Sequence, residues 1–154
     1  MKKYAFIFLI CNLLFISCQK SELEKKLIQE HSVWYIFQYD SITKDYRNLN
    51  YAYIFKSNGK CDYVLYDFSE NRLSSYLEAM SQDIVVHNNW KYNEKTREIS
   101  IMYFDYTVEK YTKDTLYLRF KKSDKYDILV NLGLKNPRTL KAVNWKPENK
   151  SREK

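Results

Sequence analysis

The chain has 154 residues, of which 26 are Lys or Arg, 19 are Asp or Glu and 15 are Tyr, whereas Gly and Pro occur only twice each. This length accommodates one domain with its own hydrophobic core and excludes a large multidomain protein. The positive excess of residues 18–154 belongs to the basic C-terminal tail 135–154, because residues 18–134 carry 17 basic and 17 acidic side chains. A basic tail without a basic face argues against nucleic acid as a partner.

The N-terminal segment 1–17 is predicted to be a signal peptide. Lys2 and Lys3 form a positively charged start, and an apolar run from Tyr4 to Ile16 follows, interrupted only by Asn12. This run of 13 residues is too short for a transmembrane helix, which needs about 20 residues. Its length fits the apolar region of a secretory signal.

The end of this segment, Phe15-Ile16-Ser17-Cys18, resembles the lipobox of bacterial lipoproteins, although Phe15 stands where Leu is usual. The resemblance implies cleavage before Cys18, a diacylglycerol on the Cys18 sulfur and acylation of the new amine, with fatty acids such as palmitate. Two or three acyl chains anchor a protein far more firmly than one. The alternative is an ordinary signal peptide that happens to precede a cysteine.

The polar run Gln19-Lys20-Ser21-Glu22-Leu23-Glu24 is similar to the export signal of Bacteroidota surface lipoproteins, with Leu23 interrupting the acidic run. The resemblance implies an outer-membrane location, with the protein exposed at the cell surface or otherwise on the periplasmic face. Within the tether 18–32, apolar residues at helical spacing predict that the tether becomes a short helix at the entrance of the domain. The alternative is a plain solvated tether.

Residues 33–134 are rich in aromatic and β-branched residues and predict an all-β domain. Asn58-Gly59 between two such runs is a strong hairpin signal, because both residues tolerate a positive φ. We expect a polar loop over 40–50 and a short helix or a loop over 69–83. The eight predicted strands are 33–39, 51–55, 61–68, 84–92, 98–104, 106–111, 116–121 and 126–132.

Alternation within two strands predicts which side chains share a face. Residues Ile99, Ile101 and Tyr103 are expected on one face, and Tyr117 is expected to point outward between Leu116 and Leu118. Short turns without βαβ spacing predict an antiparallel up-and-down barrel of eight strands, closed so that no edge is exposed. Such a barrel is either filled by side chains or holds one small ligand.

The order of these parts resembles the lipocalin-like domains of bacterial lipoproteins. The resemblance rests on Trp34 in the first strand, on Tyr53-Ile54-Phe55 followed by Asn58-Gly59, and on three later segments. Those segments are Trp90-Lys91-Tyr92, Ile99-Ser100-Ile101 and Leu116-Tyr117-Leu118. Lipocalins commonly carry Gly two residues before the Trp, where this chain has Ser32.

Candidate ligand-binding residues are the strand aromatics, because aromatic rings line apolar pockets, although they also fill barrel cores. They are Trp34, Tyr53, Tyr66, Trp90 and Tyr103. The mature chain keeps one cysteine, Cys61, which forms no internal disulfide and is expected to be a small buried hydrophobe.

The sequence shows no Gly-rich phosphate loop, CxxC, HExxH or nucleophile elbow. His31 and His87 alone are too few for a typical metal site. The acidic pairs Asp62/Asp67 and Asp105/Glu109 are expected on solvated strand faces. We therefore expect no cofactor, no metal and no enzymatic activity.

Three functions follow as hypotheses. The first is a lipid-anchored protein that binds a small apolar or amphipathic ligand in or near its barrel. The second is a protein-interaction module, such as an inhibitor, an immunity factor or an accessory subunit of a surface complex. The third is a hydrolase, which requires converging polar groups with shifted pKa values. The basic tail either lies on anionic groups of the membrane surface or is solvated.

Overall fold

The computed structural model describes residues 20–40, 45–75, 88–123, 125–135 and 137. The predicted signal segment 1–17, Cys18, His87 and most of the tail 135–154 lie outside these residues. The described residues form a short helix, α2 (Glu22–Leu27), and a nine-stranded sheet. The strands are β1 (Trp34–Asp40), β2 (Asp45–Phe55), β3 (Cys61–Asp67), β4 (Arg72–Ser75), β5 (Trp90–Asn93), β6 (Glu98–Ile101), β7 (Phe104–Tyr111), β8 (Thr115–Phe120) and β9 (Tyr126–Asn131).

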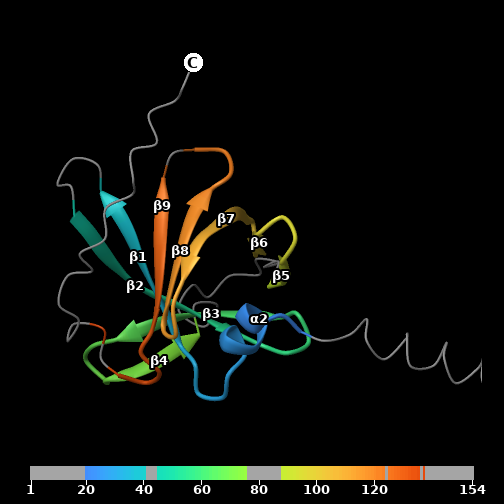
Figure 1. The fold of residues 1–154 in the computed structure, drawn as a ribbon. Helices are drawn as coiled ribbons and strands as arrows, with labels where there is room; N and C mark the ends of the chain where they lie inside the picture. Colours follow the sequence, from blue (N-terminus) through green and yellow to red (C-terminus); the bar gives the residue numbers. More distant parts are fainter. Residues whose placement is uncertain (1–19, 41–44, 76–87, 124, 136, 138–154) are drawn as a thin grey trace, which may run out of the picture.

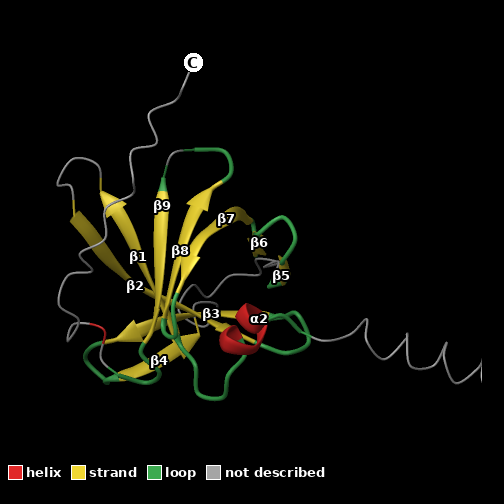
Figure 2. Cartoon of the chain, in the orientation of Figure 1, coloured by secondary structure: helices red, strands yellow, loops and turns green. Residues whose placement is uncertain are grey.

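The strands follow the order β4-β3-β2-β1-β9-β8-β7-β6-β5, and every pair in the sheet is antiparallel. The sheet curls into a half-barrel with α2 at one end (Figures 1 and 2). The all-β antiparallel meander with a short helix is therefore confirmed, but the closed eight-stranded barrel is wrong. The sheet has nine strands, and β4 and β5 are its two edges.

The two halves of the curled sheet meet at one point without forming a continuous ladder. The Trp90 amide donates to the Gly59 carbonyl at 2.8 Å, and the Cys61 amide donates to the Asn88 carbonyl at 2.6 Å. These contacts join the start of β5 to the start of β3, whereas β4 pairs with the far end of β3, at 64–67. Among the described residues, the edge strands β4 and β5 do not pair with each other, because they contact β3 at opposite ends.

Two segments form strands that the sequence did not predict. β2 begins at Asp45, inside the predicted loop 40–50, because pairing with β1 overrides the low β-propensity of its Asn residues. β4 lies inside the segment 69–83, where Leu73 pairs with Tyr66 instead of facing a helix neighbour. The Asp67 carboxylate accepts hydrogen bonds from the amides of Ser69 and Glu70 and so forms the turn before β4. The rest of 69–83, and the predicted strand start at 84–87, lie outside the described residues.

The hairpin at Asn58-Gly59 is confirmed. Gly59 has a φ of +77°, a conformation that disfavours residues with a Cβ atom. Its amide donates to the Lys56 carbonyl at 3.1 Å, and the Lys56 amide donates to the Lys60 carbonyl at 2.8 Å. Of the pair, Gly59 alone takes a positive φ, so the turn differs from the predicted one, in which both residues take it.

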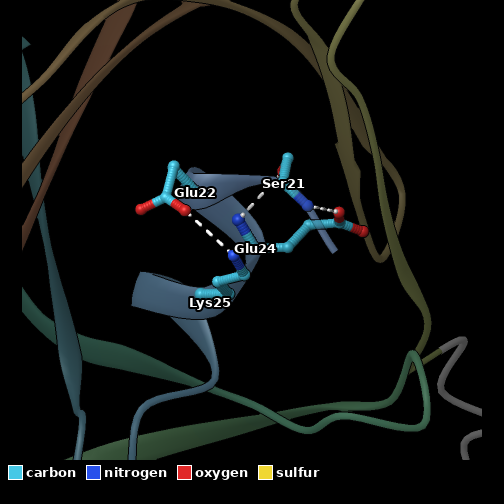
Figure 3. Close-up of polar contacts among 4 residues, drawn as sticks. All are labelled: Ser21, Glu22, Glu24 and Lys25. Carbon is cyan, nitrogen blue, oxygen red and sulfur yellow. Dashed lines mark hydrogen bonds and ion pairs between the residues drawn. The ribbon is translucent and has the colours of Figure 1, made fainter. Parts of the chain in front are cut away.

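The predicted helix is also confirmed, and it is packed into the domain. A capping box starts it: the Glu24 amide donates to Ser21 Oγ at 3.2 Å, and the Ser21 amide donates to Glu24 Oε2 at 2.8 Å (Figure 3). Lys25 pairs with Glu22 at 2.9 Å on the exposed side. Leu23 and Leu27 are buried in the core cluster, so α2 closes one end of the half-barrel.

Each face of the sheet carries an apolar cluster. The concave face is lined by Trp34, Ile36, Tyr53, Phe55, Cys61, Trp90, Ile99, Ile101, Tyr106, Val108, Leu116, Leu118 and Leu129, together with the two leucines of α2. The convex face is lined by Val33, Tyr35, Phe37, Ala52, Val64, Tyr66, Ile128 and Val130. Tyr117 packs against the convex cluster whereas its neighbours Leu116 and Leu118 lie in the concave cluster, which confirms the alternation predicted for β8.

Candidate ligand site on the concave face

The structure distributes the five predicted ligand-binding aromatics over three places. Trp34, Tyr53 and Trp90 belong to the concave cluster, and Tyr66 belongs to the convex cluster. Tyr103 is 59% exposed in the turn between β6 and β7. Tyr103 does not share a face with Ile99 and Ile101 as predicted, because β6 ends at Ile101 and Met102 takes a φ of +56° that reverses the chain. The five residues therefore do not form one site.

The two tryptophans hold the closed end of the half-barrel. The Trp34 indole N–H donates to the Leu27 carbonyl at 3.3 Å, at the C-terminal end of α2. The Trp90 indole N–H donates to the Lys56 carbonyl at 3.0 Å, and its ring meets Phe55 edge-on at 5.2 Å. Each indole thus has its polar atom satisfied by the main chain while its rings fill the core. Both tryptophans are structural at this end.

The other end of the concave face holds a buried polar group that the sequence analysis missed. Asp127 on β9 is 5% exposed. The Tyr106 hydroxyl donates to its Oδ2 at 3.0 Å, and Gln38 Nε2 lies 3.4 Å from its Oδ1. Tyr53 belongs to the same cluster, and its hydroxyl interacts electrostatically with that of Tyr106. We call Asp127, Tyr106 and Gln38 the Asp127 network.

The position of this network follows from the register of the strands. Gln38 lies near the end of β1 and pairs with Asp127 near the start of β9. Tyr106 lies near the start of β7 and pairs with Phe120 at the end of β8. These strand ends are the ones remote from α2 (Figure 1). The network therefore lies toward the open end of the half-barrel.

Burial governs the ionisation of this network. It raises the pKa of Asp127 to about 6, against the opposing effects of the hydrogen bonds from Tyr106 and Gln38 and of the Lys125 charge. Burial also raises the pKa values of Tyr106 and Tyr53 well above the usual range for tyrosine, so both hydroxyls stay protonated. At neutral pH Asp127 is mainly ionised. Among the described residues, no Lys, Arg or His forms an ion pair with it.

Aromatic rings surround the network. Tyr106 packs on Phe120 with ring centroids 4.6 Å apart, and Tyr53 packs on Tyr63 at 5.4 Å. Tyr51 stacks on Tyr63 at 5.1 Å. Phe120 is only partly buried, so solvent reaches the concave face beside Tyr106. Tyr63 is also partly buried, but it pairs with Tyr53, the register partner of Trp34, and so lies nearer α2. We call Phe120, together with the Asp127 network, the aromatic end of the half-barrel.

Phe104 extends the aromatic end toward the surface. Its ring meets the Phe120 ring edge-on at 5.9 Å, and the residue is 47% exposed. Phe104 begins β7, next to exposed Tyr103 in the preceding turn. A continuous path of rings therefore leads from the exposed β6–β7 turn to the buried carboxylate.

The remaining candidates have local structural roles. Cys61 is fully buried and free, as expected for a small hydrophobe, and burial raises the pKa of its thiol. Asp62 pairs with Lys56 at 2.7 Å, and Glu109 pairs with Arg119 at 2.6 Å. Asp105 accepts a hydrogen bond from Ser100 at 2.6 Å. The acidic pairs considered from the sequence are therefore bound to different partners.

Within the described part of the chain, no group of three or more His, Cys, Asp and Glu side chains is placed to hold a metal ion. The same part contains no helix of the length and apolarity needed to cross a membrane. No family model, curated protein or solved structure matches the chain.

Proposed function

We propose that this protein is a lipoprotein anchored to the outer membrane through Cys18 and that its half-barrel binds a small apolar or amphipathic ligand. The anchor and the cell-surface location rest on the resemblances of segments 15–18 and 19–24. The ligand-binding role is supported by one observation, the aromatic end, where a polar network lies among rings that solvent reaches.

Ligand sites in proteins are mostly apolar and contain a few polar groups that orient the ligand. The aromatic end has this composition, with Asp127 and Gln38 as polar groups and the rings of Tyr106 and partly exposed Phe120 beside them. The opposite end is closed by α2 and the two tryptophans. A ligand would therefore enter at the aromatic end.

A neutral fluorescent probe tests the proposal on residues 19–154, which retain every described element. N-phenyl-1-naphthylamine should become more fluorescent on binding the wild-type protein. Phe120→Ala should weaken binding, because the ring that packs on Tyr106 is lost. Tyr117→Ala is the matched control, because Tyr117 lies on the same strand but packs on the convex face.

Binding that is absent, or that both variants weaken equally, would contradict the proposal. Native mass spectrometry of the wild-type protein adds a second measurement. A retained small molecule that is lost on denaturation supports the ligand-binding role and identifies the class of ligand.

The second candidate, a protein-interaction module, is favoured by Tyr103 and Phe104, which expose 59% and 47% of their surface next to each other. Aromatic residues are enriched at protein interfaces. A photo-crosslinking residue at position 103 on intact cells should then trap one discrete surface protein. The same residue at position 91, an exposed position in β5, is the control.

A further inference from the structure

We propose that the ligand carries a cationic amine and that the Asp127 carboxylate binds this amine at the aromatic end. The inference deepens the proposed function and rests on it. Its starting point is the position of a carboxylate in an otherwise apolar interior, 5% exposed and facing rings from several strands.

Asp127 forms no ion pair with a described residue, although the charge of Lys125 acts on it. Its two partners there, Tyr106 and Gln38, are neutral, and the Gln38 contact is long at 3.4 Å. A carboxylate offers about four lone-pair positions, so further donors can be accepted. An ionised group is costly to bury unless an opposite charge pairs with it. An ammonium group of a ligand supplies both the donors and the charge.

The rings around Asp127 favour the same ligand. A cation is attracted to the face of an aromatic ring within about 6 Å of its centroid. Phe120 provides a partly exposed ring beside the network, where it packs on Tyr106. Asp127 repels an anion in this poorly solvated position. A fatty carboxylate should therefore bind more weakly than an amine or an alcohol of the same chain length.

The apolar part of the ligand would meet the apolar cluster beside the network. Leu118 pairs with Asp127, and Leu129 and Ile36 follow it toward α2, all three buried in the cluster. An alkyl or aryl group attached to the amine would contact the partly buried residues at the open end of this cluster. The chemical class is therefore an amphipathic amine.

Three probes of equal chain length test the inference by isothermal titration at pH 7.5, below their micelle-forming concentrations: decylamine, decanol and decanoate. Residues 19–154 should bind decylamine at least about tenfold more tightly than decanol, the effect of one charge-assisted contact. Decanoate should bind most weakly. This comparison uses the wild-type protein alone and does not depend on the folding of a variant.

Asp127→Asn should remove the preference by weakening decylamine binding about tenfold while leaving decanol binding unchanged. Asp105→Asn is the matched control, because it changes the net charge equally at an exposed site bound to Ser100. It should leave both affinities unchanged.

Equal affinities for decylamine and decanol, or the same loss of decylamine binding in both variants, would overturn the inference and leave the proposed function intact. Failure of all three probes and of the neutral naphthylamine would overturn the proposed function as well.

Discussion

The hydroxyl group of Tyr106 lies 3.0 Å from Oδ2 of Asp127, although β8 separates the strands that carry the two residues. The contact crosses the concave face, where Leu118 of β8 lies opposite both Asp127 and Val108. Because Gln38 on β1 also contacts Asp127, the network joins β1, β9 and β7. It is therefore a structural link as well as a candidate binding site.

Removing the Tyr106 hydroxyl should destabilise the protein. Tyr106→Phe keeps the ring on Phe120 but leaves Asp127 without its shortest described hydrogen bond. We expect a loss of about 1–3 kcal/mol in the free energy of unfolding, measured with urea, because a buried acceptor loses its donor. Tyr111→Phe is the control, because Tyr111 contacts Lys26 through its ring, and the substitution retains that ring. A similar loss in both variants would contradict the role of Tyr106.

The stability of the protein should depend on pH through Asp127. Its folded-state pKa of about 6 lies above the ordinary value of 3.8, so the folded protein holds this proton more tightly than the unfolded chain. The contribution of Asp127 to stability is therefore present below pH 4 and is lost as the pH rises through 6. Relative to Asp127→Asn, the wild-type protein should lose about 3 kcal/mol over this range.

Urea unfolding of both proteins at several pH values measures this difference and cancels the titration of other groups. A stability difference that stays constant between pH 4 and 8 would show that Asp127 titrates normally. If the wild-type protein gained stability relative to Asp127→Asn as the pH rose, the result would contradict the prediction.

The start of α2 should depend on Ser21. Ser21→Ala removes the hydroxyl that accepts the Glu24 amide, and such a change costs about 1 kcal/mol. Ser57→Ala is a suitable control, because Lys20 binds the main-chain carbonyl of Ser57, which the substitution retains. Thermal unfolding followed by circular dichroism should show a lower midpoint for Ser21→Ala alone.

Cys61 should react slowly with thiol reagents. Its side chain is fully buried and burial raises its pKa, so little thiolate forms. In residues 19–154, which contain no other cysteine, labelling with 5,5′-dithiobis-(2-nitrobenzoate) should be much slower in buffer than in urea. Equally rapid labelling in both solvents would show that the concave face opens around β3.

Local patterns in the sequence predicted the local features of the fold. Asn58-Gly59 marked a hairpin, and the alternation around Tyr117 identified the two faces of β8, because both signals depend on neighbouring residues. The edge strand β4 was missed because Leu73 stood at helical spacing, while its pairing partner Tyr66 decided its conformation.

The candidate site was harder to predict because its members are distant in the chain. Gln38 and Tyr106 are 89 and 21 residues from Asp127. One signal was available: Asp127 and Leu129 share a face of β9, opposite the predicted face of Ile128 and Val130. A charge on an inward face indicates a polar network, but the partners appear only after the sheet has curled.

The capping box at Ser21 has a consequence for the proposed membrane anchor. Only Gln19 and Lys20 separate Ser21 from Cys18, and these three residue steps reach at most roughly 10 Å. With acyl chains on Cys18, as proposed, the α2 end of the domain would lie against the lipid headgroups. The aromatic end, at the far side of the half-barrel, would then face the surrounding medium, and ligand would be collected from solution instead of from the bilayer.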